Sequence, residues 1–111
     1  MSDSMERIAR MLGFARRAGK ISFGVDGICK AMAKKNAAPK LIVISKSASD
    51  STKGKLVSKS EFYGIKCIEI DIVQQELGRL LGKEYAPAAV AVNDSAFAEE
   101  ILKAYCALSE Q

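Results

Sequence analysis

The residues best suited to binding chemistry lie between Arg16 and Lys34, where basic side chains surround a glycine that precedes a predicted helix. We expect Gly24 to open this helix, because a glycine lets an anionic backbone approach the free N–H groups at the positive end of the helix dipole. Lys30 and Lys34 are four residues apart, so on a helix they lie on one face beside that approach. The pattern is typical of a site that binds phosphate groups.

The charge of the chain is divided unevenly along its length. Residues 1–66 contain 14 Lys and Arg against 5 Asp and Glu, a net charge of +9, whereas residues 67–111 contain 3 against 8, a net charge of −5. Such asymmetry is common in proteins that bind polyanions, with nucleic acid as the leading partner. The alternative is a basic surface that only keeps the protein in solution.

Several kinds of enzyme are disfavoured by the residues that the chain lacks. It has no histidine, which argues against Ser-His and Cys-His hydrolases and most zinc enzymes. Cys29, Cys67 and Cys106 are far apart, so each is expected to be a small buried apolar residue rather than part of a disulfide or metal site. Segment 78–83 (Gly-Arg-Leu-Leu-Gly-Lys) has one residue too few between its glycines for a phosphate loop. We expect no catalytic residue, cofactor or metal.

The length of 111 residues suits a single domain, residues 1–111. Its hydrophobic fraction of 49% suffices for a core, and the aromatic fraction of 6% predicts that this core is aliphatic. No apolar run is long enough to cross a membrane, and Met1–Arg10 lacks the apolar segment of a signal peptide. We therefore expect a cytoplasmic protein with no membrane partner.

The hydrophobic pattern predicts five helices that alternate with four strands. Helices are expected at 3–17, 25–35, about 50–63, about 72–82 and 95–108, and strands at 20–23, 41–44, 65–70 and 88–92. Asp71 with Gln74 is expected to cap the fourth helix. The apolar run 41–44 is typical of a strand covered on both faces. The order αβαβαβαβα therefore predicts an α/β fold, a three-layer α-β-α sandwich with a four-stranded mixed sheet.

Several segments, in this order and spacing, resemble one known superfamily. They are residues 19–24 (Gly-Lys-Ile-Ser-Phe-Gly), Lys30, 41–44 (Leu-Ile-Val-Ile) and 76–83 (Glu-Leu-Gly-Arg-Leu-Leu-Gly-Lys). Together they are similar to the kink-turn RNA-binding ribosomal proteins of the L-seven-Ae and L-thirty-e type, over about residues 8–102. The hydroxyl-rich segment 45–53 and the compact length resemble the bacterial YlxQ-like members.

The resemblance implies a non-catalytic protein that binds structured RNA, kink-turn-like or bulged, in association with the ribosome or translation. It implies two surfaces that meet at the RNA. The first consists of Gly24, Val25, Asp26, Gly27, Lys30 and Lys34, and the second of Glu84, Tyr85, Ala86, Pro87 and Ala88. Lys20 and Lys46 are expected to flank both surfaces.

The resemblance also implies a role for individual side chains. The lysines would neutralise phosphates, and Tyr85 would stack on an extruded base. Asp26 would accept hydrogen bonds from a guanine edge. Asp26 and Gly27 stand where the family often has Asn and Glu, which favours a weaker or differently shaped RNA target.

Two other functions stay open at this point. The chain is also compatible with a protein-interaction or dimerisation module, in which the acidic C-terminal part contacts a basic partner. The third possibility is a substrate-binding accessory domain for an RNA-modifying enzyme, which would need a separate catalytic partner. The oligomeric state does not follow from the sequence.

Overall fold

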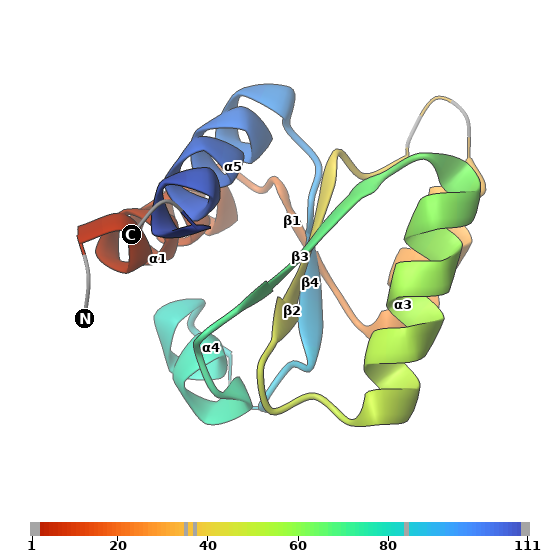
Figure 1. Ribbon diagram of the computed structural model, residues 1–111, viewed down its shortest axis with the longest axis horizontal. Helices are drawn as coiled ribbons and strands as arrows, with labels where there is room; N and C mark the ends of the chain where they lie inside the picture. Colours follow the sequence, from red (N-terminus) through yellow and green to blue (C-terminus); the bar gives the residue numbers. More distant parts are fainter. Residues whose placement is uncertain (1–2, 35, 37, 84, 110–111) are drawn as a thin grey trace.

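The computed structural model of the chain describes residues 3–34, 36, 38–83 and 85–109. Within them, helices and strands alternate in the predicted order (Figure 1). The helices are α1 (Asp3–Arg17), α2 (Val25–Met32), α3 (Asp50–Tyr63), α4 (Gln74–Leu80) and α5 (Ser95–Ser109). The strands are β1 (Ile21–Phe23), β2 (Leu41–Ser45), β3 (Lys66–Ile70) and β4 (Ala89–Val92).

The four strands form one mixed sheet with the order β1-β4-β2-β3. Strand β2 is parallel to β3, and β4 is antiparallel to both of its neighbours, β1 and β2. The carboxyl ends of β1, β2 and β3 therefore lie at the same end of the sheet as the amino end of β4. This end is the lower one in Figure 1.

Helices cover both faces of the sheet, as the alternating pattern predicts. Helices α1, α4 and α5 lie on one face, and α2 and α3 on the other (Figure 1). Strand β2 is buried along its whole length, and its side chains alternate between the two layers. Leu41 and Val43 join the cluster under α1 and α5, whereas Ile42 and Ile44 join the cluster under α2 and α3. The predicted α-β-α sandwich is confirmed.

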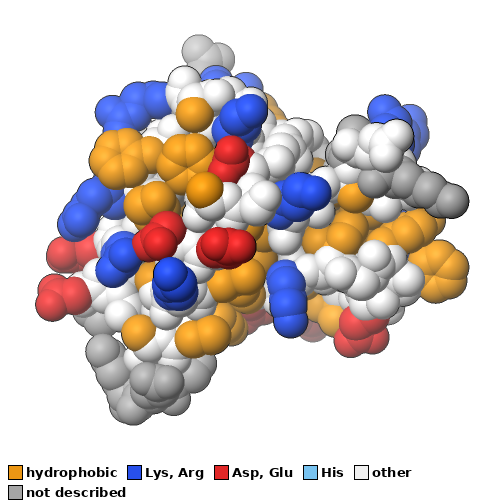
Figure 2. Space-filling model, turned by 90° about the horizontal axis from the view of Figure 1, so that it is seen from above, with side chains coloured by type: hydrophobic (Ala, Val, Ile, Leu, Met, Phe, Trp, Pro, Cys, Tyr) orange, Lys and Arg blue, Asp and Glu red, His pale blue; other side chains and the backbone are white. Residues whose placement is uncertain are grey.

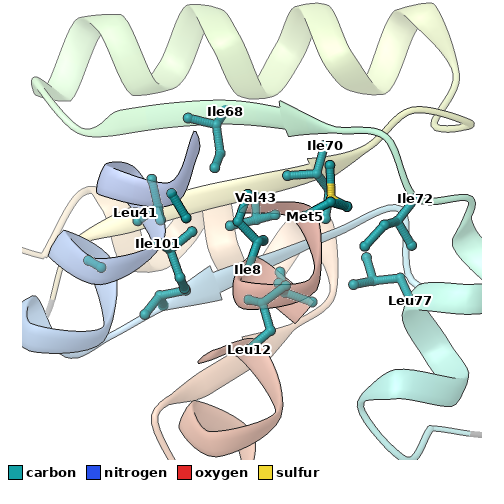
Figure 3. Close-up of a cluster of buried hydrophobic side chains, with 14 of the residues drawn as sticks. Met5, Ile8, Leu12, Leu41, Val43, Ile68, Ile70, Ile72, Leu77 and Ile101 are labelled. Carbon is teal, nitrogen blue, oxygen red and sulfur yellow. The ribbon is translucent and has the colours of Figure 1, made fainter. Parts of the chain in front are cut away.

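The larger of the two hydrophobic clusters lies beneath α1 and α5 (Figure 3). Ile8 and Leu12 are one helical turn apart on α1, and both are fully buried against the sheet and Ile101 of α5. Burying a side chain of this size contributes about 1.5–3 kcal/mol. The buried side chains of this cluster are aliphatic, as the composition predicts, and they fix α1 on the sheet.

Helix α2 is shorter than predicted. It ends at Met32, with Ala33 as the C-cap, instead of continuing to about residue 35. The last turn tightens, since the Ala33 and Lys34 amides donate to carbonyls three residues back at 3.3 and 3.0 Å. The expectation that Lys30 and Lys34 share one helix face is therefore wrong, because Lys34 follows the end of the helix.

The predicted capping of α4 by Asp71 is also wrong. The N-cap residue is Val73, which makes no side-chain capping bond, and the Asp71 carboxylate instead lies 2.7 Å from the Lys46 ammonium. The Gln74 amide donates to Ser47 Oγ at 2.9 Å, so a serine beyond β2 caps α4 from outside the helix.

The three cysteines differ in their surroundings. Cys29 and Cys67 are half-buried, but Cys106 is exposed on α5, so the expected buried role is wrong for Cys106. Burial raises the pKa of the Cys67 thiol above its ordinary value. In the described residues no three potential metal ligands gather, and no described helix combines the length and apolarity needed to span a bilayer.

The N-cap of α3 provides a direct test of the local structure. Ser49 Oγ accepts a hydrogen bond from the Thr52 amide at 3.2 Å. We expect Ser49→Ala to lower the free energy of unfolding by about 1 kcal/mol, because it leaves a helix N–H without its acceptor. Ser51→Ala, in the first turn of the same helix, is the control and should change it little. Urea denaturation measures both, and an equal loss in the two variants would contradict the capping role.

Candidate nucleic-acid interface

The end of the sheet at which β4 begins brings together the two surfaces expected from the sequence. Gly24 follows β1, Lys46 follows β2, and residues 85–88 precede β4. Phe23 pairs with Val90 across the antiparallel β1–β4 ladder. The Phe23 and Tyr85 rings meet edge to face, with centroids 6.4 Å apart and an interplanar angle of 77°. The start of α2 and the loop before β4 therefore form one continuous surface.

The backbone of Gly24 has a conformation that favours glycine. Its φ is 87° and its ψ is 118°, values that other residues rarely adopt. Gly24 is the N-cap of α2, and no described side chain caps that end. Among the described residues, nothing lies within 4 Å of the position that a Cβ would occupy there. The first turn of α2 therefore presents its N–H groups to an open, exposed approach.

The other residues in the first turn of α2 differ from one another in burial and in their contacts. Val25 is half-buried and packs against the core beneath α2 and α3, while Gly27 is exposed. Asp26 is exposed, and its carboxylate lies 3.4 Å from the Lys55 ammonium of α3. Lys55 therefore offsets part of the negative charge that Asp26 adds beside the helix N-terminus, and it was not among the predicted residues.

The loop 85–88 is held by backbone contacts to its neighbours. The Ala86 carbonyl accepts from Gln74 Nε2 at 3.1 Å, and the Ala88 carbonyl accepts from the Ser45 amide at 2.9 Å. Pro87 is buried, whereas Tyr85 is 51% exposed. The loop backbone is thus anchored while the tyrosine ring is presented to solvent. Glu84, also expected at this surface, lies outside the described residues.

A glycine on α4 makes this loop position possible. A Cβ on Gly78 would lie 2.6 Å from the Tyr85 carbonyl oxygen and 3.2 Å from Cδ of Pro87. Real Cβ atoms essentially never approach that closely, so any larger residue would displace the loop or the helix. Gly78 is buried, and its role in the structure is to permit this close approach.

Three residues beside the predicted ones form an aromatic and cationic cluster. The Lys83 ammonium lies 4.4 Å from the centroid of the Phe23 ring and 5.8 Å from that of Tyr85. The Arg16 guanidinium lies 5.5 Å from the Phe23 centroid. Both distances to Phe23 are within the range of cation–π attraction. In the sequence, Phe23 and Lys83 are marked only by their positions next to Gly24 and Gly82, so their contact could not be predicted from it.

The predicted lysines do not all lie at this end of the sheet. Lys46 does, paired with Asp71, and an exposed pair of this kind contributes little stability. Lys30 lies on α2 five residues beyond Val25, which is about 7.5 Å along the helix axis. Lys34 lies beyond the far end of α2. The Lys20 carbonyl accepts from the Asn93 amide, so the Lys20 backbone lies at the opposite end of β1 from Gly24.

Figure 2 shows the molecule from above Figure 1, toward the end of the sheet opposite the candidate interface. Basic side chains are scattered over this face as well. Acidic side chains lie mostly on its left part, the side of α1 and α5 in Figure 1. Positive charge therefore reaches more than one face, and a salt-dependent affinity alone would not locate a binding site.

Comparison with known proteins now identifies the family. The model of the Ribosomal protein L7Ae/L30e/S12e/Gadd45 family matches residues 6–102. The chain belongs to this family. The family resemblance drawn from the motifs is thereby confirmed, and so is the expectation of a protein without catalytic activity, since this is not a family of enzymes.

Named relatives agree with this assignment. RNA-binding protein YlxQ of Bacillus subtilis (strain 168) is 35% identical over 92 residues, which cover 83% of this chain and 88% of that protein. RNA-binding protein YlxQ of Enterococcus faecium is 28% identical over 78 residues, which cover 70% of this chain and 73% of the relative.

Solved structures share the fold of this member of the L7Ae/L30e family. A protein with unknown function from Bacillus halodurans C has a TM-score of 0.80 at 28% identity, covering 88% of this chain and 95% of its own. The Giardia lamblia 15.5kD RNA binding protein has a TM-score of 0.75 at 14% identity, covering 96% and 91%. The second likeness concerns the fold alone.

The close approach at Gly78 can be tested by substitution. We expect Gly78→Ala to lower the free energy of unfolding by about 1–3 kcal/mol, because the added methyl group overlaps the Tyr85 carbonyl. It should also shift the backbone amide resonances of residues 85–88. Gly54→Ala is the matched control in α3, where a Cβ has open space, and it should raise the free energy of unfolding by up to about 1 kcal/mol. A stable Gly78→Ala protein with unchanged resonances would contradict the close approach.

Proposed function

We propose that this protein binds structured RNA, without catalysis, at the surface where the start of α2 meets the loop before β4. The observation that carries the proposal is the contact between Phe23 and Tyr85, which joins an exposed aromatic ring to a helix N-terminus that no described side chain caps. The family of ribosomal proteins and the relatives named as RNA-binding support it. We further propose a kink-turn-like or bulged target, an association with the ribosome or translation, and a place in the cytoplasm.

The geometry suits an RNA bend better than a straight duplex. The N–H groups of the first turn of α2 suit a phosphate or a base edge, because Gly24 leaves the approach open. Tyr85 offers a ring face to an unstacked base. Because splayed bases occur in loops and bulges and not in regular duplex, the tyrosine favours such elements. The target is RNA with bases displaced beside a sharply turned backbone.

Asp26 and Gly27 tune this recognition. The Asp26 carboxylate accepts hydrogen bonds only, so it suits the donor edge of a guanine and not the mixed pattern that an Asn amide would read. Lys55, 3.4 Å away, reduces its repulsion of phosphates. Gly27 contributes no side chain, so the surface loses one polar contact and gains room. We propose that the affinity for a standard kink-turn is lower than with Asn and Glu at these positions.

The first experiment compares a short kink-turn RNA with a straight duplex of equal length, at two salt concentrations. A preference for the kinked RNA supports the proposal. Equal, salt-sensitive binding to both would point to a basic surface with another specific RNA target. No binding at low salt would contradict the proposed function and favour a protein-interaction module.

The contribution of charge is tested at Lys30. We expect Lys30→Ala to weaken RNA binding severalfold and to reduce the slope of log K against log salt by about 0.7–1, because one phosphate contact is lost. Lys40→Ala removes the same charge at the opposite end of the sheet, where the Lys40 amide donates to the Val92 carbonyl, and it should have a smaller effect. Equal effects in a fluorescence-anisotropy titration would remove Lys30 from the site.

The contribution of stacking is tested at Tyr85. We expect Tyr85→Ala to weaken binding by about 1–3 kcal/mol while leaving the salt slope nearly unchanged, since no charge is removed. Tyr63→Ala is the matched control, because Tyr63 is 40% exposed at the end of α3, on the other side of the sheet. An unchanged affinity of the Tyr85 variant for the kinked RNA would exclude stacking by this ring.

A further inference from the structure

A basic groove lies between α1 and the end of α4, beside the surface described above and outside the predicted site residues. Its volume is about 430 Å³, within the range of ligand-binding hollows. Its walls include Arg10, Arg16 and Arg17 from α1 and Gly82 from the turn after α4. Among the described residues that line the groove, three are arginines and none is acidic.

Two of these arginines are held by aromatic rings. The Arg16 guanidinium lies 5.5 Å from the Phe23 centroid, and the Arg17 guanidinium lies 4.8 Å from the Phe14 centroid. Arg16 Nε is buried and, in the described part of the chain, has no hydrogen-bond partner. A guanidinium beside a ring keeps donor edges available for a phosphate. The groove thus contains cationic donors, and no described residue that lines it carries a negative charge.

Gly13 keeps the groove open. It lies within α1, one turn from Arg10 and one turn from Arg17, on the same side of the helix. A glycine inside a helix is destabilising relative to alanine, and no described residue outside the helix backbone lies within 4 Å of the Cβ position, so packing against the described residues does not require it. The missing side chain leaves space for a ligand above the helix backbone.

The groove is continuous with the candidate RNA surface through two residues. Arg16 lines the groove and also faces the Phe23 ring, which meets Tyr85. Gly82 lines the groove, and the next residue, Lys83, faces the same Phe23 ring. Among the described residues, the path from Tyr85 to the groove runs along Phe23, Arg16 and Lys83.

We propose that this groove binds the sugar–phosphate backbone of the RNA segment that flanks the bend, so that α1 extends the contact made by α2 and the loop 85–88. The proposal rests on the proposed function, because the ligand is the same RNA. Arg10 and Arg17 neutralise phosphates, and Gly13 admits the backbone. Arg16 links the groove to the aromatic cluster.

The test uses the double variant Arg10→Gln/Arg17→Gln, which leaves Phe23, Lys83 and Tyr85 unchanged. We expect RNA affinity at low salt to fall about tenfold and the salt slope to decrease by about 1.4–1.8, as expected for two lost phosphate contacts. The charge-matched control is Lys40→Gln/Lys66→Gln, since Lys40 precedes β2 and Lys66 is the first residue of β3, both at the opposite end of the sheet. The lysine double variant should lose clearly less RNA affinity at low salt, and its salt slope should decrease less.

A second pair of variants separates blocking from unfolding. Gly13→Gln fills the groove without changing charge, and we expect it to weaken binding of a kinked RNA with long stems severalfold. Gly13→Ala should raise the melting temperature, because alanine favours the helix, and should affect binding less than glutamine does. A kinked RNA with its stems shortened to the pairs nearest the bend should bind the Gly13→Gln protein and the unchanged protein equally well.

The possible outcomes separate this inference from the proposed function. In the first outcome, the unchanged protein prefers the kinked RNA and Tyr85→Ala weakens its binding, but the arginine double variant and Gly13→Gln match the unchanged protein in affinity and salt slope. The groove proposal is then overturned and the proposed function stands. If the unchanged protein binds no RNA, both fail. A loss of affinity in the arginine variant that the lysine control matches would also overturn the groove proposal.

Discussion

Antiparallel pairing of β4 with both β1 and β2 brings the parts of the candidate interface together. Because β4 runs against its neighbours, its first residues lie beside the last residues of β1 and β2. The loop that leads into β4 must then lie beside the turn that leads from β1 into α2. This explains why segments about 60 residues apart in the chain share one surface. The buried side chains of β4 fix that register on both faces of the sheet.

The second constraint is the narrow space between α4 and the loop that follows it. Gly78 lets the loop backbone pass close to the helix, while Gln74 donates to the Ala86 carbonyl from the first turn of the same helix. Ser47 in turn binds the Gln74 amide from the end of β2. The loop is thus positioned by contacts on its inner side, and the exposed Tyr85 ring is not one of them. The residues that hold the loop in place therefore differ from the residue that the loop exposes to solvent.

The fold could be predicted from the sequence because strong local signals agree with one another. The uninterrupted apolar run of β2 and the alternation of helices and strands are sufficient to predict the three layers of the fold. The site was predicted less completely, since motif positions do not reveal which end of a strand a side chain occupies. Lys20 precedes β1 and therefore lies away from Gly24, although only three residues separate them. Phe23 and Lys83 meet only through tertiary packing, which no local pattern reports.

The lysines and the arginines of the chain are placed in ways that suit different roles, the lysines for attraction of a polyanion and the arginines for its orientation. The lysines expected at the surface are exposed on flexible side chains, and basic residues also occupy the opposite end of the sheet (Figure 2). Such charges attract any polyanion and lose their effect as salt rises. Arg16 and Arg17 differ because each guanidinium lies near an aromatic ring, 5.5 and 4.8 Å from its centroid. In the proposed complex, guanidinium groups restrained in this way would favour one direction of phosphate approach, so these arginines and Tyr85 would discriminate between RNA shapes better than the lysines.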